Sequence, residues 1–264
     1  MNDRQKNKQG AKGNSLSNVG IVFVSPIVGL TPSLSASFQP LIDEGATYIG
    51  IDIFDAVRKP KTFWKILGLT MLPGAHKRRI AFANTFEERR VFDRIEEAIR
   101  ELRAKGKKVV LGGMSGGFIF VSRIVQNTSD SELAGHPVRE LAEYVVGLFG
   151  ISPLIYYPLG VYRPDTRLDA IPAHMPTILF FADGDDIIPP GTVKYAEEAS
   201  NELPNIAVHF LRRHDFHAPM PLKHQYFGGP DFVSPLTNIF WHPPAEKYTI
   251  DLKYDFLKKI ALTP

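Results

Sequence analysis

An apolar run that ends in glycines around a single serine constrains this chain more than any other segment. Residues 109–111 are Val-Val-Leu, the sequence GGMSGG follows at residues 112–117, and apolar residues then resume. The spacing Gly113-x-Ser115-x-Gly117 fits a nucleophile elbow, in which a serine occupies a strained turn between a strand and a helix. Glycine is needed on both sides because a Cβ there would collide with the neighbouring backbone. The segment predicts a strand, a sharp turn and a helix; the alternative interpretation is a glycine-rich loop without chemistry.

Five other apolar runs have the length of strands that are buried on both faces of a parallel sheet. They are residues 19–24, 47–54, 145–151, 177–182 and 206–211. Helices are expected between them, at residues 33–44, 85–105, 117–126, 137–144 and 192–203. A last helix is expected to pack through one apolar face formed by Tyr248, Leu252, Phe256 and Ile260. Strands that alternate with helices predict a single α/β domain over residues 19–264, with helices on both faces of the sheet.

Composition excludes several classes of protein. Hydrophobic residues make up 44% of the chain, as is ordinary for a globular protein, and no apolar run is long enough to span a bilayer. The absence of cysteine excludes disulfides and thiolate metal ligands. The net charge of +3 arises in residues 1–18, a polar tail that we expect to be disordered. The balanced remainder gives no support for nucleic-acid binding, and the tail lacks a secretory signal, so we expect a cytoplasmic protein.

A basic insertion interrupts the pattern of strands and helices at residues 56–84. Seven basic residues surround the apolar sequence FWKILGL at residues 63–69, and no acidic residue lies between Asp55 and Glu87. One interpretation is an insertion whose apolar side packs on the body while its charges face water. The other is a lid that recognises an acidic or lipid-like substrate or makes peripheral contact with a membrane.

Residues with the chemistry of a catalytic triad follow three different predicted strands. Ser115 follows the strand that precedes the glycines, Asp185 follows the fifth predicted strand, and His214 and His217 follow the sixth. In a parallel sheet the carboxyl ends of the strands lie at one edge, where ligands bind. A serine nucleophile requires a base within hydrogen-bond distance and an acid that orients the base. The chain order Ser, Asp, His therefore predicts that the three groups meet at this edge.

Other polar residues near these positions have simpler interpretations. Asp183 and Asp186 flank the predicted acid as turn residues, although either could replace it. His214 and His217 have the spacing of a metal pair, but no third ligand accompanies them and no metal is expected. The glycines at 112–117 fit neither a phosphate-binding loop nor a dinucleotide fingerprint. The remaining histidines are interpreted as structural or surface residues: His76, His136, His174, His209, His224 and His242.

The motifs resemble those of the α/β-hydrolase superfamily, and most closely those of dienelactone-hydrolase-like serine esterases. The sequence GMSGG at residues 113–117 resembles the elbow of that family, and ADGDDIIP at residues 182–189 is similar to its G-x-x-D-x-x-V-P acid loop. His214-Asp215-Phe216 resembles its H-x-F motif. The resemblance covers residues 19–261. It implies a three-layer α/β-hydrolase fold with a mostly parallel sheet of about six strands, without the superfamily's two leading antiparallel strands.

The resemblance also implies roles for individual residues. Asp185 would be the acid, and the N–H groups of Gly116 and Ile27 would form the oxyanion hole, although Ser25-Pro26 replaces the family's usual His-Gly. His214 fits the H-x-F motif, whereas His217 fits the usual interval of about five residues after the strand. We favour His214 as the base, with His217 as the alternative. The nucleophile is serine, whereas dienelactone hydrolases proper use cysteine.

The predicted function is cleavage of carboxylic esters or thioesters through a Ser-His-Asp triad and an acyl-enzyme, without a cofactor. The partner would be a small-molecule ester or acyl substrate, bound by an apolar pocket that loops 152–176 and 218–243 form with the insertion. One alternative is an acyltransferase that uses the same triad. Another, which the altered Ser25-Pro26 loop favours, is a non-catalytic α/β-hydrolase-fold protein that binds a ligand or partner. The sequence carries no indication of an oligomeric state.

Overall fold

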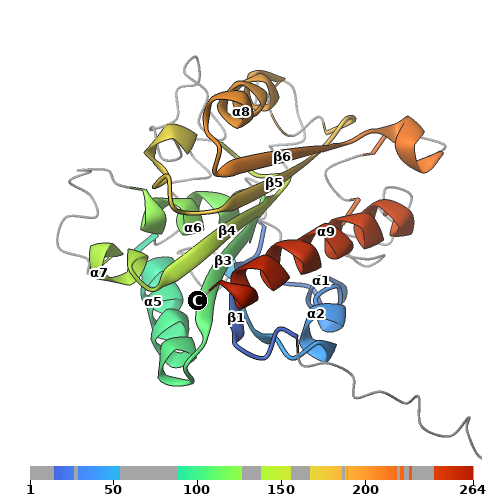
Figure 1. The fold of residues 1–264 in the computed structure, drawn as a ribbon. Coiled ribbons are helices and arrows are strands. Elements are labelled where there is room, and N and C mark those ends of the chain that lie inside the picture. Colours follow the sequence, from blue (N-terminus) through green and yellow to red (C-terminus); the bar gives the residue numbers. More distant parts are fainter. Residues whose placement is uncertain are drawn as a thin grey trace, which may run out of the picture.

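Six parallel strands form one sheet at the centre of the molecule, in the order β2-β1-β3-β4-β5-β6 (Figure 1). The strands are β1 (Val19–Val24), β2 (Thr47–Ile51), β3 (Lys108–Met114), β4 (Val145–Ile151), β5 (Thr177–Ala182) and β6 (Ile206–Leu211). The computed structural model describes residues 15–26, 29–53, 88–126, 138–155, 167–185, 188, 190–218, 221–222, 226–227 and 241–263. These ranges contain no antiparallel strand, and the predicted parallel α/β sheet is confirmed.

Helices cover both faces of the sheet and complete three layers (Figure 1). One face packs against α5 (Glu88–Ala104), α6 (Gly117–Val125), α7 (Val138–Ala142) and α8 (Pro190–Glu202). The other packs against α1 (Pro32–Ala36), α2 (Gln39–Asp43) and α9 (Pro243–Leu262). Two short 3₁₀ helices, η2 (Leu168–Ala170) and η3 (Arg213–Phe216), lie in the connections around β5 and β6.

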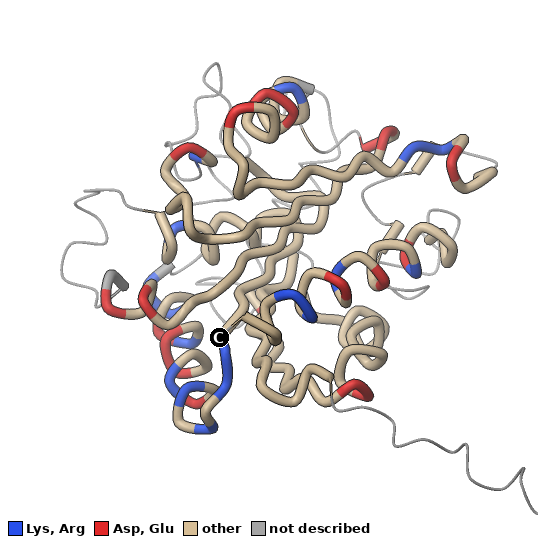
Figure 2. The backbone as a smooth tube through the Cα atoms, viewed as in Figure 1, with Lys and Arg blue, Asp and Glu red and all other residues tan. Residues whose placement is uncertain are grey.

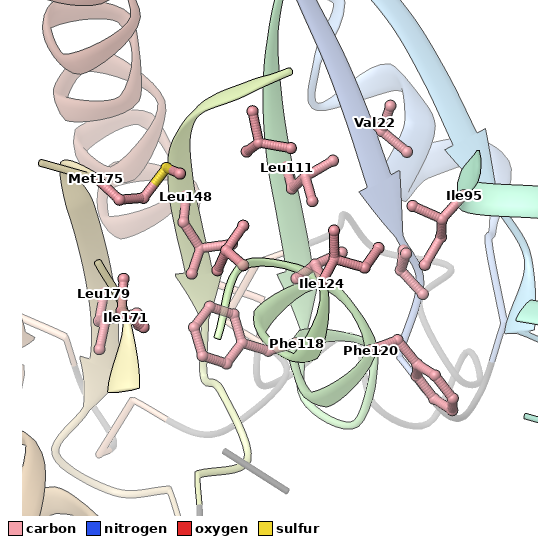
Figure 3. Close-up of a cluster of buried hydrophobic side chains, with 14 of the residues drawn as sticks. Val22, Ile95, Leu111, Phe118, Phe120, Ile124, Leu148, Ile171, Met175 and Leu179 are labelled. Atoms are coloured by element: carbon pink, nitrogen blue, oxygen red, sulfur yellow. The ribbon is translucent and has the colours of Figure 1, made fainter. Parts of the chain in front are cut away.

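Successive side chains of the central strands enter opposite layers, as strand geometry requires. Val22 and Leu111 face α5 and α6, where they pack with Phe118 (Figure 3). Phe23 and Val110, one residue along each strand, belong to the core beneath α9. Both cores are therefore built from the same strands, and this explains why the strands are continuously apolar rather than alternating.

Charged side chains lie mainly on the helices and connections, and the strands are almost free of them (Figure 2). Lys108, at the start of β3, is the one Asp, Glu, Lys or Arg residue in the six strands. Its Nζ donates to the carbonyl oxygens of Ile260 and Ala261, at 3.3 and 3.2 Å. The lysine ammonium thus hydrogen-bonds to the last carbonyl groups of α9, where the helix dipole favours a cation.

Three sequence expectations need correction at their boundaries. The helix expected over residues 33–44 is two short helices, because Pro40 cannot continue a helix and instead lies in the first turn of α2. The second strand ends at Ile51 rather than at residue 54. Residues 15–18 belong to the fold rather than to the tail, since Leu16 is fully buried and the Asn18 side chain donates to Ala261 O at 3.0 Å.

The buried face of α9 follows the expected stripe only in part: Ile260 is buried, and Leu252 and Phe256 are partly buried against the same core. Thr249, Lys253 and Leu257 are fully buried, whereas Tyr248 is 42% exposed. A lysine therefore occupies the centre of the face that the apolar spacing assigns to Leu252 and Phe256. Lys253 belongs to the buried face because it packs among phenyl rings from three other segments of the chain.

Several expectations concern residues outside the described ranges. The tail up to residue 14, the basic insertion at residues 56–84 and the residues expected to cap α5 at 85–87 all lie there. Among the helices that are described, none combines the length and apolar character needed to cross a membrane.

Candidate functional site

Ser115 occupies the turn between β3 and α6 with a left-handed backbone, φ +52°. A Cβ on Gly113 would lie 2.5 Å from Phe118 N, and a Cβ on Gly117 would lie 2.4 Å from the carbonyl oxygens of Val24 and Ser25. Only glycine fits at these distances, because the clashes are with main-chain atoms that cannot move independently. The sharp strand-to-helix turn expected from the spacing of the glycines is confirmed.

The last residue of β4 and a residue beyond it hold the main chain of Ser115 in its strained conformation. Ser115 N donates to Ile151 O at 3.0 Å, and Leu154 N donates to Ser115 O at 3.1 Å. The side chain is 4% exposed. Non-glycine residues with positive φ persist only where the surrounding structure enforces them, and they concentrate at functional sites.

A helix N-terminus with an available N–H group adjoins the serine. Gly116 is the N-cap of α6, and its N–H donates to no acceptor within the described ranges. The positive end of the helix dipole and this N–H can stabilise an oxyanion at the serine. The second predicted donor, Ile27, lies outside the described residues.

Ser25 joins two strand ends. Its buried hydroxyl donates to Pro26 O at 3.1 Å and accepts from Ile53 N at 3.0 Å. Because both contacts are internal, the side chain links the ends of β1 and β2 rather than facing a substrate.

Asp185 lies directly beyond β5, at the same edge of the sheet as Ser115. Its Oδ1 accepts from Ile188 N at 3.2 Å, and its N–H donates to Ala182 O at 3.2 Å, so the residue closes a tight turn. Its negative charge also reaches the fully buried Tyr226, whose pKa is raised mainly by burial and further by the carboxylates of Asp185 and Glu246.

The two candidate histidines follow β6, with His214 inside η3 and His217 at its end. His214 Nε2 lies 3.0 Å from Asp215 Oδ1, and its side chain is 72% exposed. His217 is also exposed and adopts φ +50°. Within the described part of the chain, neither imidazole hydrogen-bonds to Ser115 or to Asp185. Catalytic hydrogen bonds are often long or misaligned in unliganded enzymes, so this arrangement leaves both histidines as candidates.

Phe216 anchors the histidine segment to the start of α9. Its ring centroid lies 6.1 Å from that of His242 and 5.5 Å from that of Tyr248, both in edge-to-face contacts. His242 caps α9 by accepting from Ala245 N at 3.3 Å, and its partial burial lowers its pKa. This agrees with the interpretation of His242 as structural.

Ser152 is a second strained serine at this edge that the sequence does not reveal. It follows β4 with φ +41°, is fully buried, and its Oγ has no hydrogen-bond partner among the described residues. Its N–H donates to Phe180 O at 2.8 Å. The Ser-Pro dipeptide at this position indicates a turn, but turn chemistry alone does not predict positive φ or burial.

Replacing Ser152 by glycine is expected to increase the free energy of unfolding by about 1–2 kcal/mol. Glycine removes the left-handed strain and the unsatisfied hydroxyl, and together these outweigh its larger unfolded-state entropy. Denaturant unfolding of Ser152→Gly and Ser152→Ala separates the two contributions, because alanine removes only the hydroxyl. A loss of stability in both variants would contradict the prediction.

A depression of about 310 Å³ lies beside β2 and the first turns of α5. Its walls are formed by Ile51, Asp52, Arg90, Val91, Asp93, Arg94 and Glu97. It contains none of the predicted site residues. No group of three metal-ligating side chains occurs in the described part of the chain.

Comparison with known proteins identifies the fold. No family model and no curated sequence matches this chain. Solved structures do match. A Klebsiella pneumoniae protein assigned as a dienelactone hydrolase has a TM-score of 0.60 and 12% identity, over 94% of this chain and 89% of its own. The carboxylesterase Cest-2923 from Lactobacillus plantarum has a TM-score of 0.56 and 13% identity, over 94% and 88%.

A lipolytic enzyme from the metagenome-derived pair LipS and LipT gives a similar match, with a TM-score of 0.56 and 11% identity over 92% of this chain and 94% of its own. The α/β-hydrolase fold predicted from the sequence is therefore confirmed, and dienelactone-hydrolase-like structures are among those most similar to it. At these identities the likeness concerns the fold, and the chemistry has to be argued from this chain's own residues.

Proposed function

We propose that this chain is a serine hydrolase that cleaves carboxylic esters or thioesters. Ser115 Oγ attacks the carbonyl carbon while the imidazole of His214 or His217 accepts its proton. The same imidazole then returns the proton to the leaving alcohol or thiol, and an acyl-enzyme remains. Water, activated by the imidazole, attacks the acyl carbon and releases the acid and free Ser115.

The remaining groups orient the base and stabilise charge. The Asp185 carboxylate accepts a hydrogen bond from the imidazole and stabilises its cationic form. The N–H groups of Gly116 and Ile27 bind the oxyanion, where a single donor is typically worth about 3–4 kcal/mol of the activation barrier. No step requires a cofactor.

The geometry of the elbow carries this proposal. Ser115 has φ +52°, two flanking glycines whose Cβ positions are occupied by backbone, and at the neighbouring helix start an N–H that no described residue accepts. Strain of this kind lowers stability and contributes no packing, so a purely structural loop has no use for it.

The proposal is tested with an alkyl fluorophosphonate probe followed by peptide mapping, together with p-nitrophenyl esters of increasing acyl length. We expect one label per chain, located on Ser115, and competition between the probe and the preferred ester. Ser115→Ala is expected to take up no label and to hydrolyse none of the esters while keeping the wild-type unfolding curve.

A non-catalytic binding protein is the second candidate. It is favoured by the Ser25 hydroxyl, which is committed to Pro26 and Ile53, and by imidazoles that contact neither Ser115 nor Asp185 at rest. Absence of both labelling and hydrolysis at every acyl length would support this candidate and contradict the proposed hydrolase.

A further inference from the structure

We propose that Asp183 is a positioning residue for the hydrolysis, because its carboxylate holds both ends of the segment that carries the two candidate histidines. Asp183 Oδ2 accepts from Arg213 N at 2.7 Å, and Asp183 Oδ1 accepts from Leu222 N at 3.3 Å. His214 and His217 lie between these two donors in the sequence. One side chain therefore closes the histidine loop, here residues 212–218 with 221–222.

Main-chain contacts join this loop to the turn that carries the acid. Asp183 N donates to Leu211 O at 3.0 Å, and Gly184 N donates to Leu222 O at 2.9 Å. A Cβ on Gly184 would lie 2.5 Å from Pro221 Cβ, so the close approach of the two segments requires glycine. The turn of Asp185 and the histidine loop therefore meet along residues 183–184.

Arg213 and Ala218 close the interior of the histidine loop. Arg213 Nε donates to Ala218 O at 3.0 Å, and Ala218 N donates to Arg213 O at 3.1 Å. These bonds give the residues around His214 and His217 a defined shape. They do not connect that shape to the sheet, and among the side chains of the described residues it is Asp183 that binds the loop at both ends.

Loss of the carboxylate is expected to alter geometry more than stability. Asp183 is exposed, so water can replace it as the acceptor for both N–H groups at little cost. The loop ends then keep only their main-chain bonds to residues 183 and 184, so they can shift further relative to Asp185, which is two residues away in the same turn. A displacement of about 1 Å in a catalytic group can lower the rate about 100-fold.

The test measures kcat and KM for a p-nitrophenyl ester. The concentration of active chains is taken from complete labelling with the fluorophosphonate, and kcat is expressed per labelled chain. Asp183→Ala is expected to lower kcat about 10- to 100-fold and to change KM less than about threefold. Asp183→Asn is expected to fall between Asp183→Ala and wild type, because its amide retains one acceptor oxygen. The control is Asp43→Ala. It removes an exposed carboxylate at the end of α2, which accepts a hydrogen bond from the Gln39 side chain, and this variant is expected to keep the wild-type kcat.

A second readout does not depend on catalysis. The amide protons of Arg213 and Leu222 are expected to exchange with solvent at least about tenfold faster in Asp183→Ala than in wild type, because both lose their acceptor. Unchanged exchange at both positions would overturn the inference even if the variant were inactive.

The inference rests on the proposed function, and its failure can be distinguished from the failure of that function. If Ser115→Ala retains hydrolysis, the proposed triad is wrong whatever Asp183 does. If Ser115→Ala is inactive but Asp183→Ala keeps its kcat per labelled chain within threefold, Asp183 does not position the base. A reduced fraction of labelled chains at unchanged kcat would likewise overturn the inference, since it indicates a merely structural role.

Discussion

Only one of the two histidines beyond β6 is expected to be essential: replacing it with asparagine should lower kcat for ester hydrolysis about 10⁴- to 10⁶-fold. The same substitution at the other histidine should change kcat less than about tenfold. A Ser-His-Asp mechanism moves one proton through one imidazole, which must contact Ser115 and Asp185 together. His214 lies inside η3 and His217, three residues later, is its left-handed C-cap, so both cannot occupy that place.

Asparagine is the appropriate replacement at both positions. It has no basic nitrogen, and it tolerates the left-handed backbone of His217 better than alanine does. Because both side chains are exposed, neither substitution removes core packing, and unfolding curves should match that of wild type. Retention of more than a tenth of kcat in both variants would show that neither imidazole is the base.

The resting contacts of the histidines indicate what each result would mean. If His214 is essential, its imidazole must leave Asp215, which it contacts in the resting structure, and turn toward Asp185. The side chain is 72% exposed, so it has room to turn. If His217 is essential, its positive φ is the second strained backbone at this edge, after that of Ser115, to have a catalytic purpose. The Phe216 contacts with α9 remain in place in both cases.

The sheet and the elbow could be predicted because their causes are local. β1, β4, β5 and β6 begin and end where the apolar runs do, since a strand buried on both faces needs uninterrupted apolar residues. The glycines at 113 and 117 are required by main-chain atoms within a few residues or on the adjacent strand. A residue pattern is enough to predict an element when the contacts that require those residues lie within the element or on its neighbouring strand.

The role of Asp183 could not be predicted, because its partners are main-chain N–H groups 30 and 39 residues further along the chain. Any residue except proline supplies such a donor, so the partners leave no trace in the sequence. The helix periodicity of α9 misses the burial of Lys253 for a related reason. It assumes that lysine is exposed, whereas the rings around Lys253 come from segments at residues 38, 149 and 227.

Lys253 is the most unusual buried group in the described part of the chain. Its side chain is fully buried, and its Nζ has no hydrogen-bond partner. The Nζ lies 4.1 Å from the ring centroid of Phe227, 4.4 Å from that of Phe38 and 5.6 Å from that of Phe149. Phenyl faces attract a cation, but they replace only part of the hydration that an ammonium group loses. Burial accordingly lowers the Lys253 pKa from 10.5 to about 7, against a smaller opposing effect of the Glu246 carboxylate.

The free energy of unfolding is therefore expected to rise by about 3 kcal/mol between pH 7 and pH 9.5. In this interval the unfolded chain keeps Lys253 protonated, while the folded chain has released the proton. Because the unfolded state binds more protons, a rise in pH destabilises it relative to the folded state. Below pH 7 both states are protonated and this contribution is constant at its minimum. Above pH 10 the trend reverses, because burial raises the pKa of Tyr48 and Tyr226 and only the unfolded tyrosines ionise.

Lys253→Met is expected to remove this pH dependence and to raise the free energy of unfolding at pH 7 by about 2–4 kcal/mol, because methionine fills the same space without a charge to desolvate. The matched control is Lys247→Met on the same helix, where the lysine is exposed and pairs with Asp251 at 2.6 Å; its loss should change stability by less than about 0.5 kcal/mol. Denaturant unfolding of all three proteins at pH 7, 8 and 9.5 measures these differences.

A flat wild-type profile, or a Lys253→Met variant that is less stable than wild type at pH 7, would mean that the phenyl rings stabilise the ammonium form as well as water does. Phe149 connects this lysine to the strand that carries the elbow: its ring centroid lies 5.6 Å from Lys253 Nζ, and the ring occupies the space that a side chain at Gly112 of β3 would need.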